Sequence, residues 1–364
     1  MREKNWFREH WDQLRSTAIG AVLIGAVVFG WYSVRMYQNR KAVEAIITER
    51  SQAALEEAAA DTGETELMSE SVQTQLLAED TVEYQGKTYR RNSYVKAILC
   101  MGVDRSDIMT EEKGFDEAGQ ADGIFLLAQD TARNALKILM IPRDTMTEIS
   151  VINPDMSIAG KEISHLTLAY ANGDGKEGSC ENMVEAVENL FYGFAIDHYL
   201  AADTKIISSL NDAAGGVTVT VPTSGMEKRD PSFVKGETIT LHGEQAEAFV
   251  RYRDIHRDHS ALYRMDQQQE YITQYFKAVQ DMAREDSQIV SKLFTMIQDY
   301  MVTDMGKEVY LKVAMDAITG EGLSKDDFYT VPGNSVTTDM YDEYYPDQQA
   351  TIPILLRIFY RETE

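Results

Sequence analysis

The sequence predicts an α/β protein, a layered α-β-α domain with a central mixed β-sheet, preceded by one N-terminal transmembrane helix. Three observations indicate this fold class. Apolar β-type runs alternate with helical patterns beyond residue 81. Short polar turns join some of these runs directly, which requires antiparallel pairing within the sheet. Residues 16–34 carry no charged side chain.

The first 35 residues divide into a short tail, 1–15, and an apolar segment, 16–35. The uncharged stretch is about as long as a helix that crosses a bilayer, and Trp31 and Tyr32 stand at its end, where aromatic rings favour the interface. Because no small-residue cleavage site follows, we interpret it as an uncleaved signal anchor rather than a signal peptide. We expect a single-pass protein of the cell membrane, with a cytoplasmic N-terminus and an extracytoplasmic C-terminal domain.

Residues 36–80 form a predicted stalk or linker, because they are rich in Ala, Glu, Gln and Thr and carry few large apolar groups. The folded domain, 81–283, begins with a hairpin of two short strands, 82–84 and 87–89, and a buried strand, 94–101. The apolar runs 124–128 and 136–141 flank a polar turn and predict a second hairpin.

Helical patterns follow at 181–191 and 203–213, with a short strand near 197–200 between them. After Gly215-Gly216 comes an alternating strand, which Pro222 ends. The segments 243–251 and 264–281 are predicted as helices. We expect 284–364 to be a helical extension packed on the domain, with a short strand at 328–331 and a final helix at 348–359.

Charge and cysteine content exclude several classes of protein. The chain has 59 acidic and 35 basic side chains and a net charge of −24, which argues against a nucleic-acid binder, since such a protein needs a broad basic surface. Its two cysteines, Cys100 and Cys180, exclude a disulfide-dense scaffold and a zinc cluster. A single bridge between them stays open, but the apolar run around Cys100 favours a free, buried thiol.

A group of arginines stands out in this acidic chain, because four fall within fourteen residues: Arg251, Arg253, Arg257 and Arg264. Guanidinium groups bind phosphate oxygens in a planar, bidentate manner, although a charged run is also typical of a solvated helix face. Arg251 and Arg253 share a side only in an extended backbone, so we expect the preceding helix to end near Arg251. Arg264 and Gln268 share one face of the next helix.

Polar residues also follow the predicted strand ends. Asp104 follows the buried strand, Asp122 precedes the run at 124–128, and Arg143 and Asp144 follow the run at 136–141. Open α/β sheets bind ligands at the carboxyl ends of strands, although Asp is also a common turn residue. A coherent site would hold a pyrophosphate and Mg²⁺, which typically takes one or two carboxylates: Arg143, Arg251, Arg253 and Arg264 on the phosphates, Asp104 and Asp122 on the metal.

Other catalytic patterns have little support. His256 and His259 lie in a strongly polar segment that is typical of solvent-exposed side chains. None of Ser106, Ser164 and Ser179 stands in the G-x-S-x-G context of a nucleophile elbow.

A set of short motifs follows in a fixed order between residues 94 and 280. They are Gly102-Val103-Asp104, Ala121-Asp122, Ile141-Pro142-Arg143-Asp144-Thr145, His165 to Tyr170, Leu210 to Val217, Gly243-Glu244-Gln245-Ala246, Arg251-Tyr252-Arg253 and Arg264 to Gln269. As an ordered set these motifs are specific, and they closely resemble those of the LytR-CpsA-Psr family, which the single N-terminal anchor suits too.

The resemblance implies a membrane-anchored phosphotransferase that moves a glycopolymer, such as a teichoic acid or capsular polysaccharide, from a polyprenyl-pyrophosphate carrier to peptidoglycan. By position in the motifs, Asp104 and Asp122 would bind Mg²⁺. The pyrophosphate would be held by Arg143, Arg251, Arg253, Arg264 and Gln268, and the polyprenyl tail would lie between sheet and helices. The resemblance leaves the general base open between Asp104 and Asp144.

The chain departs from the family pattern at three positions. Gln120 stands where an arginine is usual ahead of Asp122, Ala261 replaces a usual acidic residue, and Gln267 replaces a second arginine. Arg257 or Arg105 could compensate for the missing guanidinium. The departures keep two alternatives open: a polyprenyl-phosphate-binding or wall-regulatory protein without catalysis, and a lipid pyrophosphatase that uses water as acceptor.

Overall fold

The computed structural model describes residues 76–105, 108–254, 260–338 and 341–363. The described residues belong to one compact unit, Ser69–Glu364. The predicted tail, the membrane anchor and residues 36–75 of the stalk lie outside the described residues, as do Ser106, His256, Arg257 and His259. Among the helices that the structure describes, none is long and apolar enough to cross a membrane.

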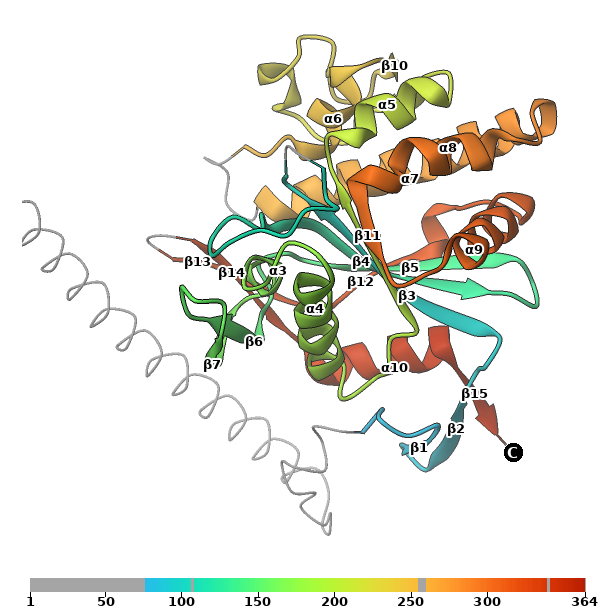
Figure 1. The fold of residues 1–364 in the computed structure, drawn as a ribbon. Helices are drawn as coiled ribbons and strands as arrows, with labels where there is room; N and C mark the ends of the chain where they lie inside the picture. Colours follow the sequence, from blue (N-terminus) through green and yellow to red (C-terminus); the bar gives the residue numbers. More distant parts are fainter. Residues whose placement is uncertain (1–75, 106–107, 255–259, 339–340, 364) are drawn as a thin grey trace, which may run out of the picture. The chain divides into compact units, whose positions relative to one another are not determined.

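A six-stranded mixed sheet forms the centre of the unit (Figure 1). The predicted hairpin pairs β4 with β5, and β3 pairs antiparallel to β4, whereas β3–β8 and β5–β12 are parallel pairs. The mixed sheet that the sequence predicts is therefore confirmed. In spatial order the strands are β11 (Met301–Thr303), β8 (His198–Asp203), β3 (Val95–Val103), β4 (Ala121–Asp130), β5 (Ala135–Ile141) and β12 (Phe328–Thr330).

Helices cover both faces of this sheet, which gives the predicted α-β-α layers (Figure 1). One face packs on α3 (Thr167–Ala171), α4 (Glu177–Leu190) and α10 (Gln348–Phe359), and alternate residues of β3, such as Leu99 and Met101, belong to that core. On the other side lie α7 (Ser260–Glu285), α8 (Ile289–Ile297) and α9 (Lys307–Thr319).

A smaller unit packs beside the sheet. It contains α5 (Ile206–Ala213), α6 (Glu244–Arg251) and the antiparallel pair β9 (Val217–Thr220) and β10 (Thr238–Leu241). Its own apolar cluster includes Phe233 and Phe249, whose rings meet edge to face at a centroid distance of 5.6 Å. As the sequence predicts, α6 ends at Arg251, and Tyr252 is extended.

Two hairpins are absent from the sequence prediction. They are β6 (Met146–Ile152) with β7 (Ile158–His165), and β13 (Gly333–Thr337) with β14 (Asp342–Pro346). Many of the residues in β7 and β13 are exposed or half-buried, so their strands lack the apolar alternation that predicts a strand. Both hairpins lie next to the strand ends that carry the candidate site, because Thr145 and Tyr344 form an isolated bridge.

The C-terminal residues are built into the sheet as well as packed on it. Both edge strands of the central sheet, β11 and β12, come from residues beyond 300. The last strand, β15 (Tyr360–Thr363), pairs with β2 (Lys87–Arg91), which also pairs with β1 (Thr81–Tyr84). Leu77 is already buried ahead of the first strand.

Candidate anion-binding site

Strand pairing brings the predicted site residues together at one end of the central strands, which we call the strand-end edge of the sheet. Val103 at the end of β3 pairs with Ala121 at the start of β4, and Ile124 of β4 pairs with Ile141 at the end of β5. Asp104, Asp122 and Arg143 adjoin these positions. The sequence-based expectation that they lie at a common edge is therefore met by the strand register.

Helix α7 lies directly over this edge. A Cβ atom added to Gly123 would approach Gln268 Nε2 to 3.3 Å, so glycine allows the close contact between strand and helix. Arg264 lies one helical turn before Gln268 and is 5% exposed. Its Nη2 donates to the carbonyl oxygen of Asp122 at 3.0 Å, and its Nη1 lies 3.6 Å from Asp122 Oδ2. The predicted shared face of Arg264 and Gln268 thus contacts the start of β4.

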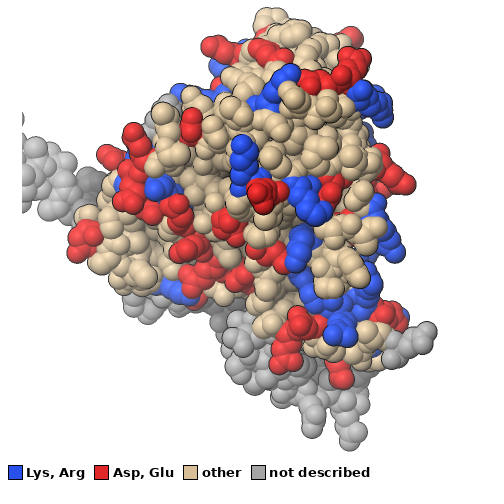
Figure 2. All heavy atoms as spheres, turned by 45° about the vertical axis from the view of Figure 1, so that its right-hand side comes forward, with Lys and Arg blue, Asp and Glu red and all other residues tan. Residues whose placement is uncertain are grey.

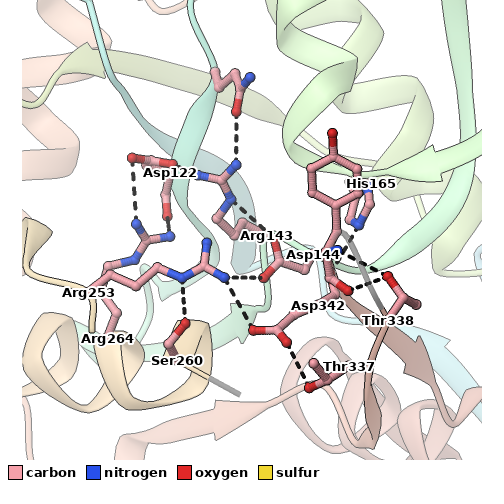
Figure 3. A network of polar contacts seen from close by, with 12 residues as sticks. Asp122, Arg143, Asp144, His165, Arg253, Ser260, Arg264, Thr337, Thr338 and Asp342 are labelled. Carbon is pink, nitrogen blue, oxygen red and sulfur yellow. Dashed lines mark hydrogen bonds and ion pairs between the residues drawn. The ribbon is translucent and has the colours of Figure 1, made fainter. Parts of the chain in front are cut away.

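Asp122 stands between two guanidinium groups (Figure 3). Arg143 Nη1 donates to Asp122 Oδ1, while Arg264 faces the other oxygen. Arg143 Nη2 donates to Gln120 Oε1 at 2.8 Å, and Arg143 Nε lies 3.3 Å from Asp144 Oδ1. The Gln120 side chain therefore accepts a hydrogen bond where the resemblance leads one to expect a further cation.

The arginines of this cluster repel one another. Burial lowers the pKa of Arg143 to about 10, and repulsion from Arg264 is the next cause. Burial also lowers the pKa of Arg264 to about 10, with repulsion from Arg253 as the next cause. Both stay charged near neutral pH, so the site combines partly buried positive charges that a compact anion would stabilise.

Arg253 joins the cluster from the segment after α6. Its Nε donates to Ser260 Oγ at 2.6 Å, and its Nη2 lies 3.3 Å from Asp342 Oδ2 and 3.8 Å from Asp144 Oδ2 (Figure 3). Asp342 belongs to β14, in the C-terminal part of the chain. The sequence predicts neither Ser260 nor Asp342 as a site residue, because neither lies in a motif or next to an apolar strand.

Two predicted site residues stand apart from the core of the cluster. Arg251, at the last position of α6, donates to Glu247 Oε1 one turn earlier at 2.8 Å. Its charge still acts on Arg264, whose pKa it helps to lower. Asp104 is exposed, and its Oδ1 accepts a hydrogen bond from the backbone N–H of Gln120 at 2.6 Å.

The structure corrects one suggested compensation for Gln120. Arg105 is 4% exposed and donates from Nη1 to the carbonyl oxygen of Gly175 at 2.7 Å and from Nη2 to that of Ile108 at 3.2 Å. Two backbone carbonyl groups therefore bind this guanidinium group within the neighbouring loops. It cannot replace the missing arginine beside Arg143. Arg257, the other candidate, lies outside the described residues.

The two cysteines are free thiols, as favoured from the sequence. Cys180 is buried in α4 and Cys100 lies on β3. Cys100 is partly buried on the face opposite to Leu99, together with Phe125 and Leu127 of β4, which alternate with Gly123 along that strand. Gly123 belongs to the same face and contacts Gln268 of α7. The face turned toward α7 therefore carries several apolar side chains that are not fully covered.

The donor set at the sheet edge fits a hard divalent cation. Both candidate ligands, Asp104 and Asp122, supply carboxylate oxygens, and Mg²⁺ completes an octahedral shell with water and phosphate oxygens. Asp104 is exposed, and its Oδ2 makes no hydrogen bond or ion pair within the described part of the chain. Asp122 bonds to Arg143 and Arg264 here, so it would share its oxygens between arginine and metal.

The molecular surface shows charges of both signs on one face. In Figure 2, Lys and Arg side chains gather mainly on the right and lower right of this face, and Asp and Glu side chains mainly on its left and at its top. Positive charge in the site comes from three arginines of separate segments: Arg143, Arg253 and Arg264. Fold and site define a layered α/β domain with a candidate anion-binding site, rich in arginine and carboxylate groups, at the ends of the central strands.

Comparison with known proteins identifies the family. The model of the LytR-CpsA-Psr family matches residues 53–354, so the chain belongs to this family. A polyisoprenyl-teichoic acid–peptidoglycan teichoic acid transferase TagU from Halalkalibacterium halodurans is 32% identical over 158 residues, which cover 43% of this chain and 44% of that protein. TagV from Bacillus subtilis, with the same transferase description, is 31% identical over 186 residues, 48% of this chain and 43% of that protein. The chain thus spans less than half of these curated relatives.

Solved structures share the fold. The crystal structure of B. subtilis TagV matches with a TM-score of 0.52 and 21% identity, over 73% of this chain and 97% of that chain. A structure of TagT bound to LIIa-WTA matches with a TM-score of 0.53 and 17% identity, over 73% of this chain and 89% of that chain. At these identities the likeness supports the fold.

Proposed function

We propose that the protein is a membrane-anchored glycopolymer phosphotransferase. It would move a polymer of teichoic acid or capsular polysaccharide type from a polyprenyl-pyrophosphate carrier to peptidoglycan. The observation that supports this most is the convergence of Arg143, Arg253 and Arg264 at one sheet edge, beside Asp122. The anchor predicted at residues 16–35 would keep the site near its lipid carrier.

The arginines would bind the two phosphate groups and stabilise negative charge that develops during transfer. Guanidinium groups at fixed positions in a partly buried site are worth more than in water, because little water reorganises around them. Arg143 and Arg264 already carry a pKa lowered by burial, so a bound pyrophosphate would offset both their desolvation and their mutual repulsion.

The polyprenyl tail would lie on the sheet face that is turned toward α7. Cys100, Phe125 and Leu127 are only partly buried there, and Gly123 and Gln268 mark where this face meets the arginine cluster. An apolar chain that covered these side chains would gain about 25 cal/mol for each Å² of apolar surface removed from water.

In the proposed reaction, a hydroxyl oxygen of the acceptor sugar attacks the phosphorus atom that carries the glycopolymer. The new O–P bond completes a phosphodiester, the bond from that phosphorus to the bridging oxygen of the pyrophosphate breaks, and polyprenyl monophosphate leaves. The hydroxyl proton passes to a base. The exposed Asp104 and Asp144, which lies beside Arg143 and Arg253, are the two candidates for this base.

Asp104 and Asp122 would also hold Mg²⁺. The bound ion would supply further positive charge on the phosphate oxygens and help to orient them. The remaining coordination positions would be taken by water and by the substrate.

The test uses the full chain in detergent with a lipid-pyrophosphate-linked oligosaccharide and peptidoglycan, and measures transferred polymer and released polyprenyl phosphate. Arg143→Ala and Arg253→Ala should each lower transfer about 100-fold, with circular dichroism unchanged. Arg284→Ala is the control, since Arg284 is 76% exposed at the end of α7. Unchanged transfer in both site variants would refute the proposal.

The same assay separates the alternatives. Release of phosphate products without peptidoglycan, at an undiminished rate, would indicate a lipid pyrophosphatase. Tight Mg²⁺-dependent binding without turnover would indicate a binding or regulatory protein, an outcome that the neutral Gln120 beside Arg143 would then explain.

A further inference from the structure

Asp342 lies within the arginine cluster although no sequence motif includes it. It is the first residue of β14, and its side chain is 11% exposed. Its Oδ2 accepts a hydrogen bond from Arg253 Nη2 at 3.3 Å, across 89 positions of sequence. A carboxylate beside an anion-binding arginine opposes the anion by its charge, so its presence there needs an explanation.

The partners of Arg253 divide its donor atoms in a definite way. Nε donates to Ser260, and Nη2 lies between Asp342 and Asp144. Nη1 makes no hydrogen bond or ion pair with the described residues, and in Figure 3 it points into the space beside Arg143. Because the guanidinium is a rigid planar fork, fixing Nε and Nη2 fixes the direction of Nη1.

Asp342 is itself held on its strand. Its Oδ1 accepts a hydrogen bond from Thr337 Oγ1, its partner on β13, at 2.9 Å. Its carbonyl oxygen lies 3.1 Å from His165 Nε2. The Tyr344 amide on the same strand donates to the carbonyl oxygen of Asp144 at 2.8 Å. The β13–β14 hairpin thus fixes Asp342 and also bonds to the backbone of Asp144.

We propose that Asp342 is a positioning residue of the pyrophosphate site, which orients Arg253 so that Nη1 meets a phosphate oxygen. This inference rests on the proposed function. A carboxylate that only occupied the place of a phosphate would have to leave when the substrate binds. The contacts of Asp342 with Thr337 and His165 instead keep it in place.

The test measures binding of farnesyl pyrophosphate, a soluble polyprenyl pyrophosphate, by calorimetry with Mg²⁺ on the full chain. Asp342→Asn removes the charge and keeps the shape. If Asp342 positions Arg253, the variant should bind about tenfold more weakly, as when a partner that orients a metal ligand is lost. Glu343→Gln is the matched control, because Glu343 is the next residue on β14 and accepts from the Tyr345 hydroxyl at 2.6 Å; it should bind as the wild type does.

A double-mutant cycle shows whether Asp342 acts through Arg253. In an Arg253→Lys background, which lacks the fork, Asp342→Asn should change affinity less than twofold. Tighter or unchanged binding by Asp342→Asn alone, or an undiminished loss in the Lys background, would overturn the inference. If Arg143→Ala abolishes binding while Asp342→Asn does not alter it, only this inference fails. If the wild type does not bind the probe, the proposed function and this inference fail together.

Discussion

Gln120 offers a direct test of how the site binds phosphate. It accepts a hydrogen bond from Arg143 at 2.8 Å, at the position where the family pattern carries an arginine. Gln120→Arg would add a guanidinium group at the same strand edge. A charge-assisted hydrogen bond contributes about 1.5–3 kcal/mol, and each 1.4 kcal/mol changes affinity about tenfold. The affinity for farnesyl pyrophosphate should therefore rise about 10- to 100-fold.

The same substitution should destabilise the ligand-free protein. Arg143 would lose an acceptor and gain a cationic neighbour, in a site where burial and repulsion from Arg264 already lower its pKa. We expect a loss of about 1.5–3 kcal/mol in the free energy of unfolding, the size of one lost hydrogen bond to a charged group. The expected signature is a lower melting temperature without ligand and a larger rise on adding it.

Calorimetry gives the affinity, and thermal unfolding with and without ligand gives the stability. Gln349→Arg is the control for net charge, since Gln349 is exposed on α10; it should alter neither quantity. If folded Gln120→Arg protein binds the probe no more tightly than wild type, position 120 does not face the phosphates and the reasoning fails.

Three further outcomes are expected. Arg105→Met should lower the free energy of unfolding in urea by about 2–4 kcal/mol, because a buried guanidinium group loses its hydrogen bonds to two carbonyl groups. The control Arg133→Met changes a side chain that is 81% exposed and should alter this free energy by less than about 0.5 kcal/mol. Equal effects of the two variants would contradict the burial argument. Gly123→Val should weaken the binding of farnesyl pyrophosphate at least about tenfold, because the added side chain would displace Gln268. Unchanged affinity would show that α7 can move to accommodate the larger side chain. EDTA should suppress polymer transfer and Mg²⁺ restore it, with Asp104→Asn requiring more Mg²⁺; transfer indifferent to EDTA would exclude the metal.

The central sheet and one side of the site follow from local sequence. The apolar runs that become β3, β4 and β5 are long and bounded by polar turns, so their ends, and with them Asp104, Asp122 and Arg143, could be placed at one edge. Arg264 and Gln268 follow from helical spacing on α7. The end of α6 at Arg251 follows from the spacing of the arginines.

The other side of the site depends on contacts distant in sequence. Asp342 meets Arg253 across 89 positions, and the strand that carries it is short and half-buried. Arg105 shows the opposite difficulty: the sequence offers it as a substitute for the missing guanidinium, but after β3 its side chain donates to the carbonyl oxygen of Gly175 instead. Tertiary packing decides both cases, and no local pattern reports it. The membrane anchor and the magnesium ligands stay predictions.

The order of strands in the central sheet has a consequence for synthesis. Strands β3, β4, β5 and β8 all precede residue 204, yet their outer neighbours β11 and β12 begin only at residues 301 and 328. While the ribosome is still adding α7 and α8, the growing chain therefore exposes the edges of β8 and β5 without their outer strands, and open edges favour pairing with other chains. The long strands β8 and β5 receive their outer neighbours, which are only three residues long and therefore poor templates for pairing, only when almost the whole chain has been made.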